Sequence, residues 1–195
     1  MAIEIKNASF SYPNGFVAVE NVNLTIQAGE RVAILGQNGA GKTTTVKMMN
    51  ALYKPNKGDV LVDGINTKER TTAQIARMVG YVFQNPDDQI FNNTVKAEIE
   101  YMLRYLKLSE DEIKERSKLA IELCDLKKHL KKNPFDIPYP IRKFVTIASV
   151  IVSDPKYIIL DEPTAGQDKH GTDLLGNMIN VLQEKGITMI TITHD

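Results

Sequence analysis

The chain has 195 residues, and its 24 lysine and arginine residues equal its 24 aspartate and glutamate residues, so the formal net charge is zero. This balance argues against bulk binding to nucleic acid or to an anionic membrane as the main activity. The length allows one sizeable domain, or a core with a subdomain. The single cysteine, Cys124, excludes an internal disulfide, favours a reducing compartment and is expected to be a small buried residue.

The sequence predicts neither a secretory leader nor a membrane-spanning segment. The first ten residues alternate in polarity and include Glu4 and Lys6, unlike a leader. The longest apolar stretch, residues 144–152, is about half a bilayer span and contains Thr146 and Ser149. We therefore expect the chain to act at a membrane only through a partner.

The first third of the chain has the pattern of β-strands. Apolar residues alternate around Ile3 and Ile5 and again over residues 22–26, and a short alternating run covers residues 59–62. Residues 32–35 are continuously apolar, which predicts a strand buried on both faces. Helices are expected over residues 44–52 and 72–78, and a strand over residues 79–83.

Between residues 94 and 153 the pattern changes to helices. Apolar residues repeat at helical spacing over residues 97–106, and Ser109 with Glu112 forms a capping box that opens the next helix. A third helix is expected over residues 141–153, after a proline-rich break. Strand patterns resume over residues 157–160 and 189–193.

This order of elements predicts an α/β fold with an inserted helical subdomain. The core is expected to comprise residues 1–84, which include an N-terminal β subdomain, and residues 154–195. The helical subdomain is expected to comprise residues 85–153.

A phosphate-binding loop lies between the strand at residues 32–35 and the helix at residues 44–52. It has the full G-x-x-x-x-G-K-[ST] pattern, formed by Gly36, Gln37, Asn38, Gly39, Ala40, Gly41, Lys42 and Thr43. Glycines let the backbone fold around an anion at a helix N-terminus, while Lys42 is placed to reach the β- and γ-phosphates and the Thr43 hydroxyl to hold Mg²⁺. The alternative is a glycine-rich turn that only caps a helix. The strand–loop–helix context favours a site for a nucleoside triphosphate.

Two carboxylates follow the apolar strand at residues 157–160. In phosphate-loop ATPases a strand of this kind is expected beside the one that feeds the loop. Asp161 is then placed to hold the Mg²⁺ shell, and Glu162 to position or deprotonate the attacking water. The alternative is a strand that ends in solvent-facing acids.

Residues 161–168, Asp-Glu-Pro-Thr-Ala-Gly-Gln-Asp, resemble the Walker B and D-loop segment of the ABC-transporter ATPases. Residues 193–195, Thr-His-Asp, resemble the switch-histidine segment of that family, and residues 82–86, Val-Phe-Gln-Asn-Pro, resemble its Q-loop. The resemblance covers nearly the whole chain, in the family's order and spacing. It implies a P-loop ATPase fold, Mg²⁺-dependent ATP hydrolysis and transport-coupled activity.

The resemblance also implies roles for individual residues. Glu162, His194, Gln84 and Lys42 would be catalytic, and Thr43, Gln84 and Asp161 would hold Mg²⁺. Tyr12 would stack on adenine, Thr44 would join residues 36–43 in binding the nucleotide, and Asp168 would be the D-loop aspartate. Outside this context, Gln84 would be an ordinary surface residue and His194 a capping or core histidine.

Residues 82–91 resemble the energy-coupling-factor branch of the family, which takes up vitamins or cobalt and nickel ions. The resemblance implies an integral membrane partner and a second ATPase subunit, with no nucleic-acid partner. The chain would be cytoplasmic and peripheral on the inner face of the cell membrane.

The sequence departs from the family at the signature motif, L-S-G-G-Q. Its expected place holds Ile137, followed by Pro138, Tyr139, Pro140 and Ile141. The two prolines remove a hydroxyl and two backbone N–H groups, and Tyr139 is bulky where backbone must approach phosphate. Hydrogen bonds to charged groups contribute roughly 1.5–3 kcal/mol each, so the phosphate contact is weakened by several kcal/mol. A smaller departure is Gln167 in the D-loop.

We interpret this pattern as one half of an asymmetric ATPase heterodimer. The intact phosphate loop would pair with a complete signature on a different ATPase. An alternative is a regulatory subunit that binds ATP but hydrolyses little of it. A soluble ABC ATPase of nucleic-acid repair or translation is a third interpretation, which the neutral charge and the single cassette disfavour.

The end of the chain and two histidines carry further expectations. The chain stops one residue after His194, where the family continues, which indicates a truncated chain with an exposed sheet edge. His129 and His170 match no motif and are expected to be exposed to solvent.

Overall fold

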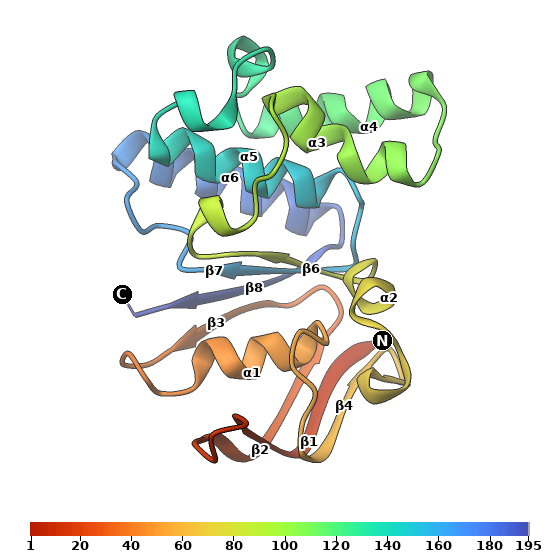
Figure 1. Cartoon of the computed structure of the whole chain (residues 1–195), viewed down its shortest axis with the longest axis vertical. Helices are drawn as coiled ribbons and strands as arrows, with labels where there is room; N and C mark the ends of the chain where they lie inside the picture. Colours follow the sequence, from red (N-terminus) through yellow and green to blue (C-terminus); the bar gives the residue numbers. More distant parts are fainter. Residues whose placement is uncertain (195) are drawn as a thin grey trace. The chain divides into compact units, whose positions relative to one another are not determined.

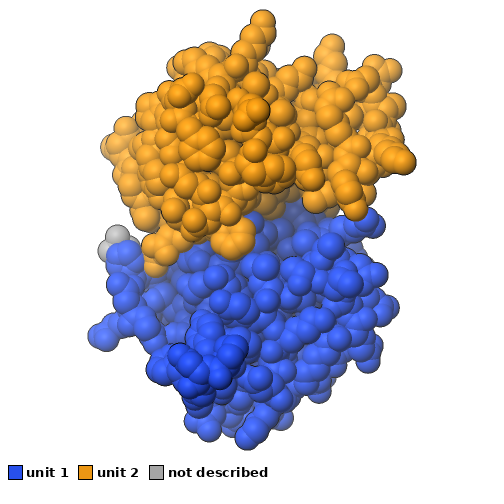
Figure 2. Space-filling view, viewed as in Figure 1, with its two compact units in different colours: residues 1–81, 155–161, 185–195 blue, residues 82–154, 162–184 orange. Residues whose placement is uncertain are grey.

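The structure is a computed structural model that describes residues 1–194, and its strands and helices are labelled in Figure 1. It has two compact units, which Figure 2 distinguishes by colour. Unit 1 contains residues 1–81, residues 155–161 and the segment from residue 185 to the end of the described chain. Unit 2 contains residues 82–154 and 162–184.

The first sheet of unit 1 has four strands in the order β2-β1-β4-β5. They are β1 (Ala2–Ser11), β2 (Val17–Gln27), β4 (Lys57–Val62) and β5 (Ile65–Asn66). All neighbours pair antiparallel. Buried residues alternate along β1, at Ile3 and Ile5, and along β4, at Val60 and Val62, so one face of the sheet is packed. Helix α1 (Lys42–Met49) contacts β1, β2 and β4.

The second sheet has the order β3-β8-β7-β6. Its strands are β3 (Arg31–Leu35), β8 (Thr188–Thr193), β7 (Tyr157–Asp161) and β6 (Val79–Val82). Both β3 and β7 pair parallel with β8. The expectation that β7 lies directly beside β3 is therefore wrong. The chain returns after β7 to insert β8 between them, and the motifs along the sequence contain no signal of that order.

The burial predicted for the strand that feeds the phosphate loop is also wrong. β3 alternates between exposed and half-buried residues, and Leu35 is 65% exposed. The reason is its position at the end of the strand order, whereas all five residues of β7 are buried.

Two short helices complete unit 1. They are η1 (Thr67–Glu69) and α2 (Thr72–Ala76), which confirms the helix expected over residues 72–78 in a shorter form. Thr71 and Gln74 form a capping box at the start of α2.

Unit 2 is built from helices. The α-helices are α3 (Val95–Tyr105), α4 (Glu110–Leu123), α5 (Tyr139–Ile151) and α6 (Lys169–Glu184). The 3₁₀ turn η2 (Pro86–Asp88) precedes α3, and the turns η3 (Lys127–His129) and η4 (Pro134–Asp136) lie between α4 and α5. Helix α5 contacts α3 and α4, and α4 also contacts α6. The sequence pattern predicts the first three of these helices, and α6 is a helix that was not expected.

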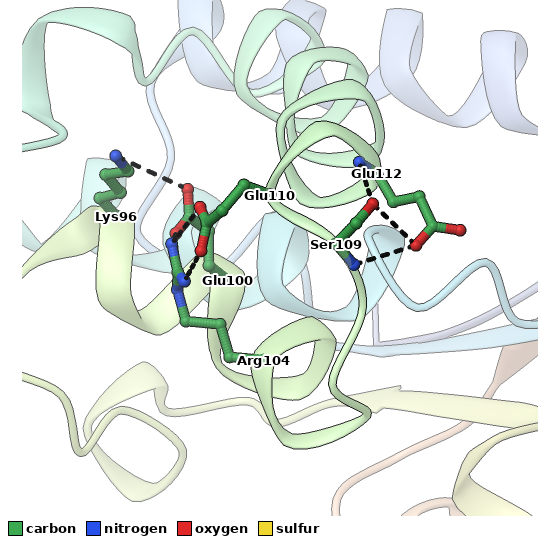
Figure 3. A network of polar contacts seen from close by, with 6 residues as sticks. All are labelled: Lys96, Glu100, Arg104, Ser109, Glu110 and Glu112. Atoms are coloured by element: carbon green, nitrogen blue, oxygen red, sulfur yellow. Dashed lines mark hydrogen bonds and ion pairs between the residues drawn. The ribbon is translucent and has the colours of Figure 1, made fainter.

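The capping box predicted at Ser109 is confirmed. Ser109 Oγ accepts from the N–H of Glu112, and a Glu112 carboxylate oxygen accepts from the N–H of Ser109 (Figure 3). Beside it, Arg104 of α3 binds Glu100 on its own helix and Glu110 on α4, each at 2.7 Å. These contacts fix the connection between α3 and α4.

The burial of the cysteine and histidines agrees only partly with expectation. Cys124 is buried and His170 is exposed, as expected. His129 was expected in solvent but is only 7% exposed, because η3 packs against the start of α3, where the Lys96 N–H donates to the Leu130 carbonyl. Burial lowers the pKa of His129, and the charges of Lys132 and Lys128 lower it further.

Among residues 1–194, no helix combines the length and the apolar character needed to cross a bilayer.

Candidate functional site

The phosphate loop, residues 36–43, connects β3 to α1. Gly41 is the N-cap of α1 and offers no side chain to the first turn, which also lacks an acidic residue. The first backbone N–H groups of a helix need acceptors from outside it, and the helix dipole favours a negative one. The opening of α1 therefore suits a phosphate group.

Only glycine fits at the position before Lys42. Gly41 has a φ of 86°, which strains any residue that carries a Cβ. A Cβ built there would lie 2.6 Å from Val19 Cγ1 and 2.9 Å from the Ala18 carbonyl oxygen. The loop can therefore approach β2 closely only with glycine at this position.

Lys42 is folded back over the loop. Its Nζ donates to the carbonyl oxygens of Gly36 at 2.5 Å and Gln37 at 2.8 Å. Both bonds keep the ammonium group at the loop, where a bound phosphate would need it.

The structure brings Tyr12 to the same helix. Tyr12 Oη lies 3.3 Å from Thr44 Oγ1 in the first turn of α1. Phe10 and Tyr53 pack edge-on against the Tyr12 ring, with centroids 5.2 and 5.8 Å away. The Phe16 ring lies more nearly parallel to it at 6.3 Å. Tyr12 is thus a half-buried aromatic held beside the first turn of α1, which follows the phosphate loop.

The parallel strands of unit 1 end together at this site. Leu35 of β3 pairs with Thr193 of β8, and Asp161 of β7 pairs with Ile192 of β8. The carboxyl ends of parallel strands form the usual ligand crevice of an open α/β sheet. His194 follows β8 directly at this edge and is exposed, while the predicted motif residue Asp195 lies outside the described residues.

One carboxylate oxygen of Asp161 accepts a hydrogen bond, and the other has no hydrogen-bond donor among the described residues. The side chain is 4% exposed, and Oδ2 accepts a hydrogen bond of 2.7 Å from Tyr81 Oη. Burial and this bond raise the pKa of Tyr81, so the phenol remains a donor. Oδ1 is buried without a hydrogen-bond partner among residues 1–194. A buried carboxylate oxygen without a donor fits a hard cation such as Mg²⁺.

Glu162, the next residue, belongs to unit 2 and has an unusual backbone. Its φ is 47° although it is not a glycine, and its side chain is 6% exposed. Lys143 of α5, whose side chain is fully buried, donates to the Glu162 carbonyl oxygen. Strained backbone persists only where surrounding contacts hold it, so Lys143 is placed to maintain this turn.

The Q-loop residue Gln84 is exposed and lies just after β6. The segment that follows Gln84 is held by contacts within unit 2. Gln89 accepts from the Phe83 N–H at 3.1 Å, and Arg142 of α5 binds Asp87 at 2.7 Å. Arg142 also donates to three backbone carbonyls of residues 134–137.

The altered signature segment opens α5. Pro138 is the N-cap, and Tyr139, Pro140 and Ile141 form the first turn. Asp168 begins α6 in the same unit, where its Oδ1 accepts from the Gly171 N–H at 2.8 Å. This contact is that of a helix N-cap, which gives Asp168 a structural role alongside the one that the resemblance implies.

Three residues support the site by contacts that the sequence does not predict, and only Gln167 among them stands out in the sequence, as a departure from the family. Tyr81 binds Asp161, Lys143 binds the carbonyl of Glu162, and Gln167 binds the carbonyl of Pro140. Each partner is distant in sequence, so only the fold reveals the contact. Within unit 1 the structure gathers Tyr12, the phosphate loop, Asp161 and His194, while Gln84, Glu162, residues 138–141 and Asp168 lie in unit 2.

Comparison with known proteins identifies the family. A family model described as ABC transporter matches residues 19–165. An ABC transporter ATP-binding protein of Pyrococcus furiosus is 48% identical over 193 residues, which span 99% of this chain and 74% of that protein. A second, from Clostridium acetobutylicum, is 40% identical over 195 residues, spanning 99% of this chain and 70% of that protein.

Solved structures agree with this assignment. The cbiO1 protein of Clostridium perfringens, described as part of the ABC transporter complex cbiONQ, superposes with a TM-score of 0.88 at 34% identity, covering 99% of this chain and 78% of that one. A dimeric ATP-binding cassette in a post-hydrolysis state with ADP and Pi gives 0.90 at 27% identity, covering 99% and 88%.

These matches confirm the predicted fold class and the predicted family. ABC ATPase domains bind ATP, normally with Mg²⁺, and hydrolyse it. In this chain the buried Asp161 oxygen without a donor suits Mg²⁺, and the uncapped start of α1 suits a phosphate of ATP. The chain belongs to the ABC transporter family, as an ATP-binding domain of its ATPase subunits.

Proposed function

We propose that this chain is the ATP-hydrolysing subunit of an importer for cobalt or nickel ions or for a vitamin, and that it works in an asymmetric pair of ATPases. The observation that carries the proposal is the combination of an intact phosphate loop with an altered signature in one chain. The loop retains Lys42, Thr43 and the uncapped start of α1. The signature segment carries prolines at the N-cap and in the first turn of α5.

The roles proposed for the site residues are those that the family resemblance implies. Lys42 and the loop amides bind the phosphates, with Thr44 beside them, and Tyr12 stacks on adenine. Thr43, Asp161 and Gln84 hold Mg²⁺, which supplies charge neutralisation to the transferred phosphoryl group. Glu162 positions or deprotonates the attacking water, and His194 contacts the γ-phosphate from the end of β8.

The prolines support the asymmetric pair. The first N–H groups of a helix form its anion-binding end, and proline has none to offer. Pro138 and Pro140 remove two of these donors from α5, and the exposed Tyr139 ring lies between them. A partner with a complete signature would serve the nucleotide on this chain's loop. The nucleotide of the partner would face Pro138, Tyr139 and Pro140 and would be hydrolysed poorly.

The importer branch and the location rest on similarity. The cbiO1 protein, part of the complex cbiONQ, is 34% identical to this chain. We infer that an integral membrane subunit binds this chain at the cytoplasmic face of the cell membrane. Uptake of radioactive cobalt, nickel or a vitamin by cells with and without the gene would identify the cargo. Loss of none of these activities would contradict this assignment.

The first test is ATP hydrolysis by the full chain alone, over a wide concentration range, with ATP binding measured in parallel. Tight binding with negligible turnover, and turnover restored by a second ATPase with a complete signature, is the expected result. Robust turnover that rises with dimer concentration would contradict the asymmetric model.

A regulatory subunit remains the second candidate, since the altered signature favours it. The Glu162→Gln variant distinguishes the two. If this chain holds the working site, the variant abolishes turnover by the assembled complex. If the assembled complex keeps its turnover, the chain regulates rather than catalyses.

A further inference from the structure

The two places where the chain departs from the family pattern are in contact with each other. Gln167, in the D-loop, donates from Nε2 to the carbonyl oxygen of Pro140 in the altered signature segment at 2.9 Å. The neighbouring Gly166 faces the Tyr139 ring, since a Cβ built on it would lie 3.4 Å from Cε1 and 3.5 Å from Cδ1. All four residues belong to unit 2. The departures are therefore parts of one structural arrangement.

The Gln167 side chain is confined on its other side by α6. A Cβ built on Gly171 would lie 2.1 Å from Gln167 Oε1 and 3.1 Å from its Cδ. Gly171 is buried, and its N–H donates to Asp168 Oδ1 at 2.8 Å. Gln167 thus binds the first turn of α5, and Asp168 binds the first turn of α6.

We propose that Gln167 is a positioning residue that fastens the D-loop to the altered signature segment, so that the two move as one body. This inference rests on the proposed function in one respect: the proposed function makes the D-loop and the altered signature segment face a second ATPase. Gln167 belongs to unit 2, whereas Tyr12, the phosphate loop and Asp161 belong to unit 1. It therefore acts on the rate of the catalytic step through the position of the D-loop, and it leaves the affinity for ATP unchanged.

The direct test uses hydrogen exchange on the full chain alone. Gln167→Met keeps the length of the side chain and removes the donor, whereas Gln167→Lys keeps a donor of similar reach. A net hydrogen bond of about 0.5–1.5 kcal/mol corresponds to a change of roughly two- to tenfold. We expect Gln167→Met to speed exchange of the amides of residues 139, 141, 142 and 165–168 by that factor, and Gln167→Lys to restore slow exchange.

A second variant reaches the same contact without changing Gln167. Gly171→Ala places a methyl group 2.1 Å from Gln167 Oε1, so the amide must move away. Alanine favours the helix more than glycine does, so α6 itself gains stability while the D-loop is released. The matched control is Gln183→Met, because the half-buried Gln183 on α6 makes no side-chain hydrogen bond within residues 1–194. The control should exchange like the wild type.

The catalytic readout is turnover by the assembled complex. Gln167→Met should lower kcat by roughly two- to tenfold with the KM for ATP unchanged, and Gln167→Lys should restore it. Equal behaviour of the Met and Lys variants would overturn the proposal, because it would show that only side-chain volume matters. Unchanged exchange in both Gln167→Met and Gly171→Ala would overturn it as well. The exchange experiment needs neither a partner nor turnover, so failure of the proposed function leaves its outcome unaffected.

Discussion

At the scale of single residues, the site depends on a buried carboxylate with an open oxygen. Asp161 Oδ2 is occupied by Tyr81, and Oδ1 lacks a partner within residues 1–194. Asp161→Asn keeps the shape and removes the charge that favours a divalent cation. We expect Mg²⁺-dependent ATP binding to weaken at least about tenfold, measured by titrating Mg²⁺ against a fluorescent nucleotide. Exposed Asp173 provides the control, and Asp173→Asn should bind normally.

A second residue-scale prediction concerns Lys143. Its fully buried side chain donates to the backbone of Glu162, the residue with a φ of 47°. Lys143→Met preserves volume, and replacing a buried charge with an apolar residue is often tolerated by the fold. We expect turnover by the assembled complex to fall at least about tenfold, because the Glu162 turn is no longer held.

Affinity for ATP should stay the same in Lys143→Met, since Lys143 lies in unit 2 and the phosphate loop in unit 1. Equilibrium binding and single-turnover hydrolysis measure the two quantities separately. Exposed Lys185 serves as the control. Unchanged turnover in Lys143→Met would show that the turn holds its shape without the lysine.

At the scale of elements, the sequence predicted most of the periodic helices and strands, but it did not predict the strand order or the burial of their residues. The capping box at Ser109 and the helix that it opens follow from local chemistry. Helix α6 was missed although Leu175, Met178, Ile179 and Leu182 have helical spacing and are buried. The position of β8 between β3 and β7 depends on long-range pairing, which no local pattern encodes. The burial of His129 likewise results from packing of η3 against α3.

An arginine joins the Q-loop segment to the start of α5. Arg142, whose side chain is 14% exposed, binds Asp87 and the carbonyls of Pro134, Phe135 and Ile137. Lysine is a point charge and cannot reproduce this fork of donors. We expect Arg142→Lys to lower the free energy of unfolding by about 1.5–3 kcal/mol, measured by urea denaturation.

The matched control is Arg104→Lys in the network of Figure 3. The Arg104 side chain is 46% exposed, so its contacts with Glu100 and Glu110 are screened by solvent. Its substitution should cost less than that of Arg142. Equal losses would show that the carbonyl contacts of Arg142 add nothing to an ordinary surface ion pair.

The two sheets of unit 1 are joined through the half-buried carboxylate of Asp63, which lies in the turn between β4 and β5. Tyr157 Oη, at the start of β7, donates to Asp63 Oδ1 at 2.5 Å, and Lys156 Nζ donates to Oδ2 at 3.1 Å. Burial alone would raise the pKa of Asp63, but the hydrogen bonds from Tyr157 and Lys156 outweigh it and lower this pKa. The stabilisation is therefore complete above the unfolded pKa of about 4 and is lost as the pH falls through the lowered folded value.

The lowered pKa of Asp63 predicts how the free energy of unfolding depends on pH. Tyr157→Phe keeps the ring and removes the donor, so it should lower the free energy of unfolding by about 1.5–3 kcal/mol at pH 7. At pH below the folded pKa of Asp63 the acceptor is neutral, and the difference should shrink to about that of a neutral bond, ~1 kcal/mol. Denaturation with urea at pH 7 and under acid conditions measures both values. A loss that is independent of pH would assign the effect to packing.

At the scale of the whole molecule, the motifs predicted which residues matter better than how they are held. The phosphate loop, Asp161 and His194 were named from the sequence, and they meet in unit 1 because β3, β7 and β8 end at one edge. The supporting contacts of Tyr81, Lys143 and Gln167 involve residues 80, 19 and 27 positions away. A motif records only local spacing, so contacts of this kind require the fold.

The division of roles between the phosphate loop and the signature segment can be tested on the whole chain. ATP at one hundred times its Kd should raise the free energy of unfolding by about 2.7 kcal/mol, since only the folded state binds it. Lys42→Ala should remove most of this gain. Tyr139→Ala should keep it, because the altered signature segment is proposed to face the nucleotide of a partner. Thermal unfolding with and without Mg²⁺ and ATP measures all three. Loss of the gain in Tyr139→Ala would mean that this segment serves the chain's own nucleotide, and the asymmetric pair would no longer follow.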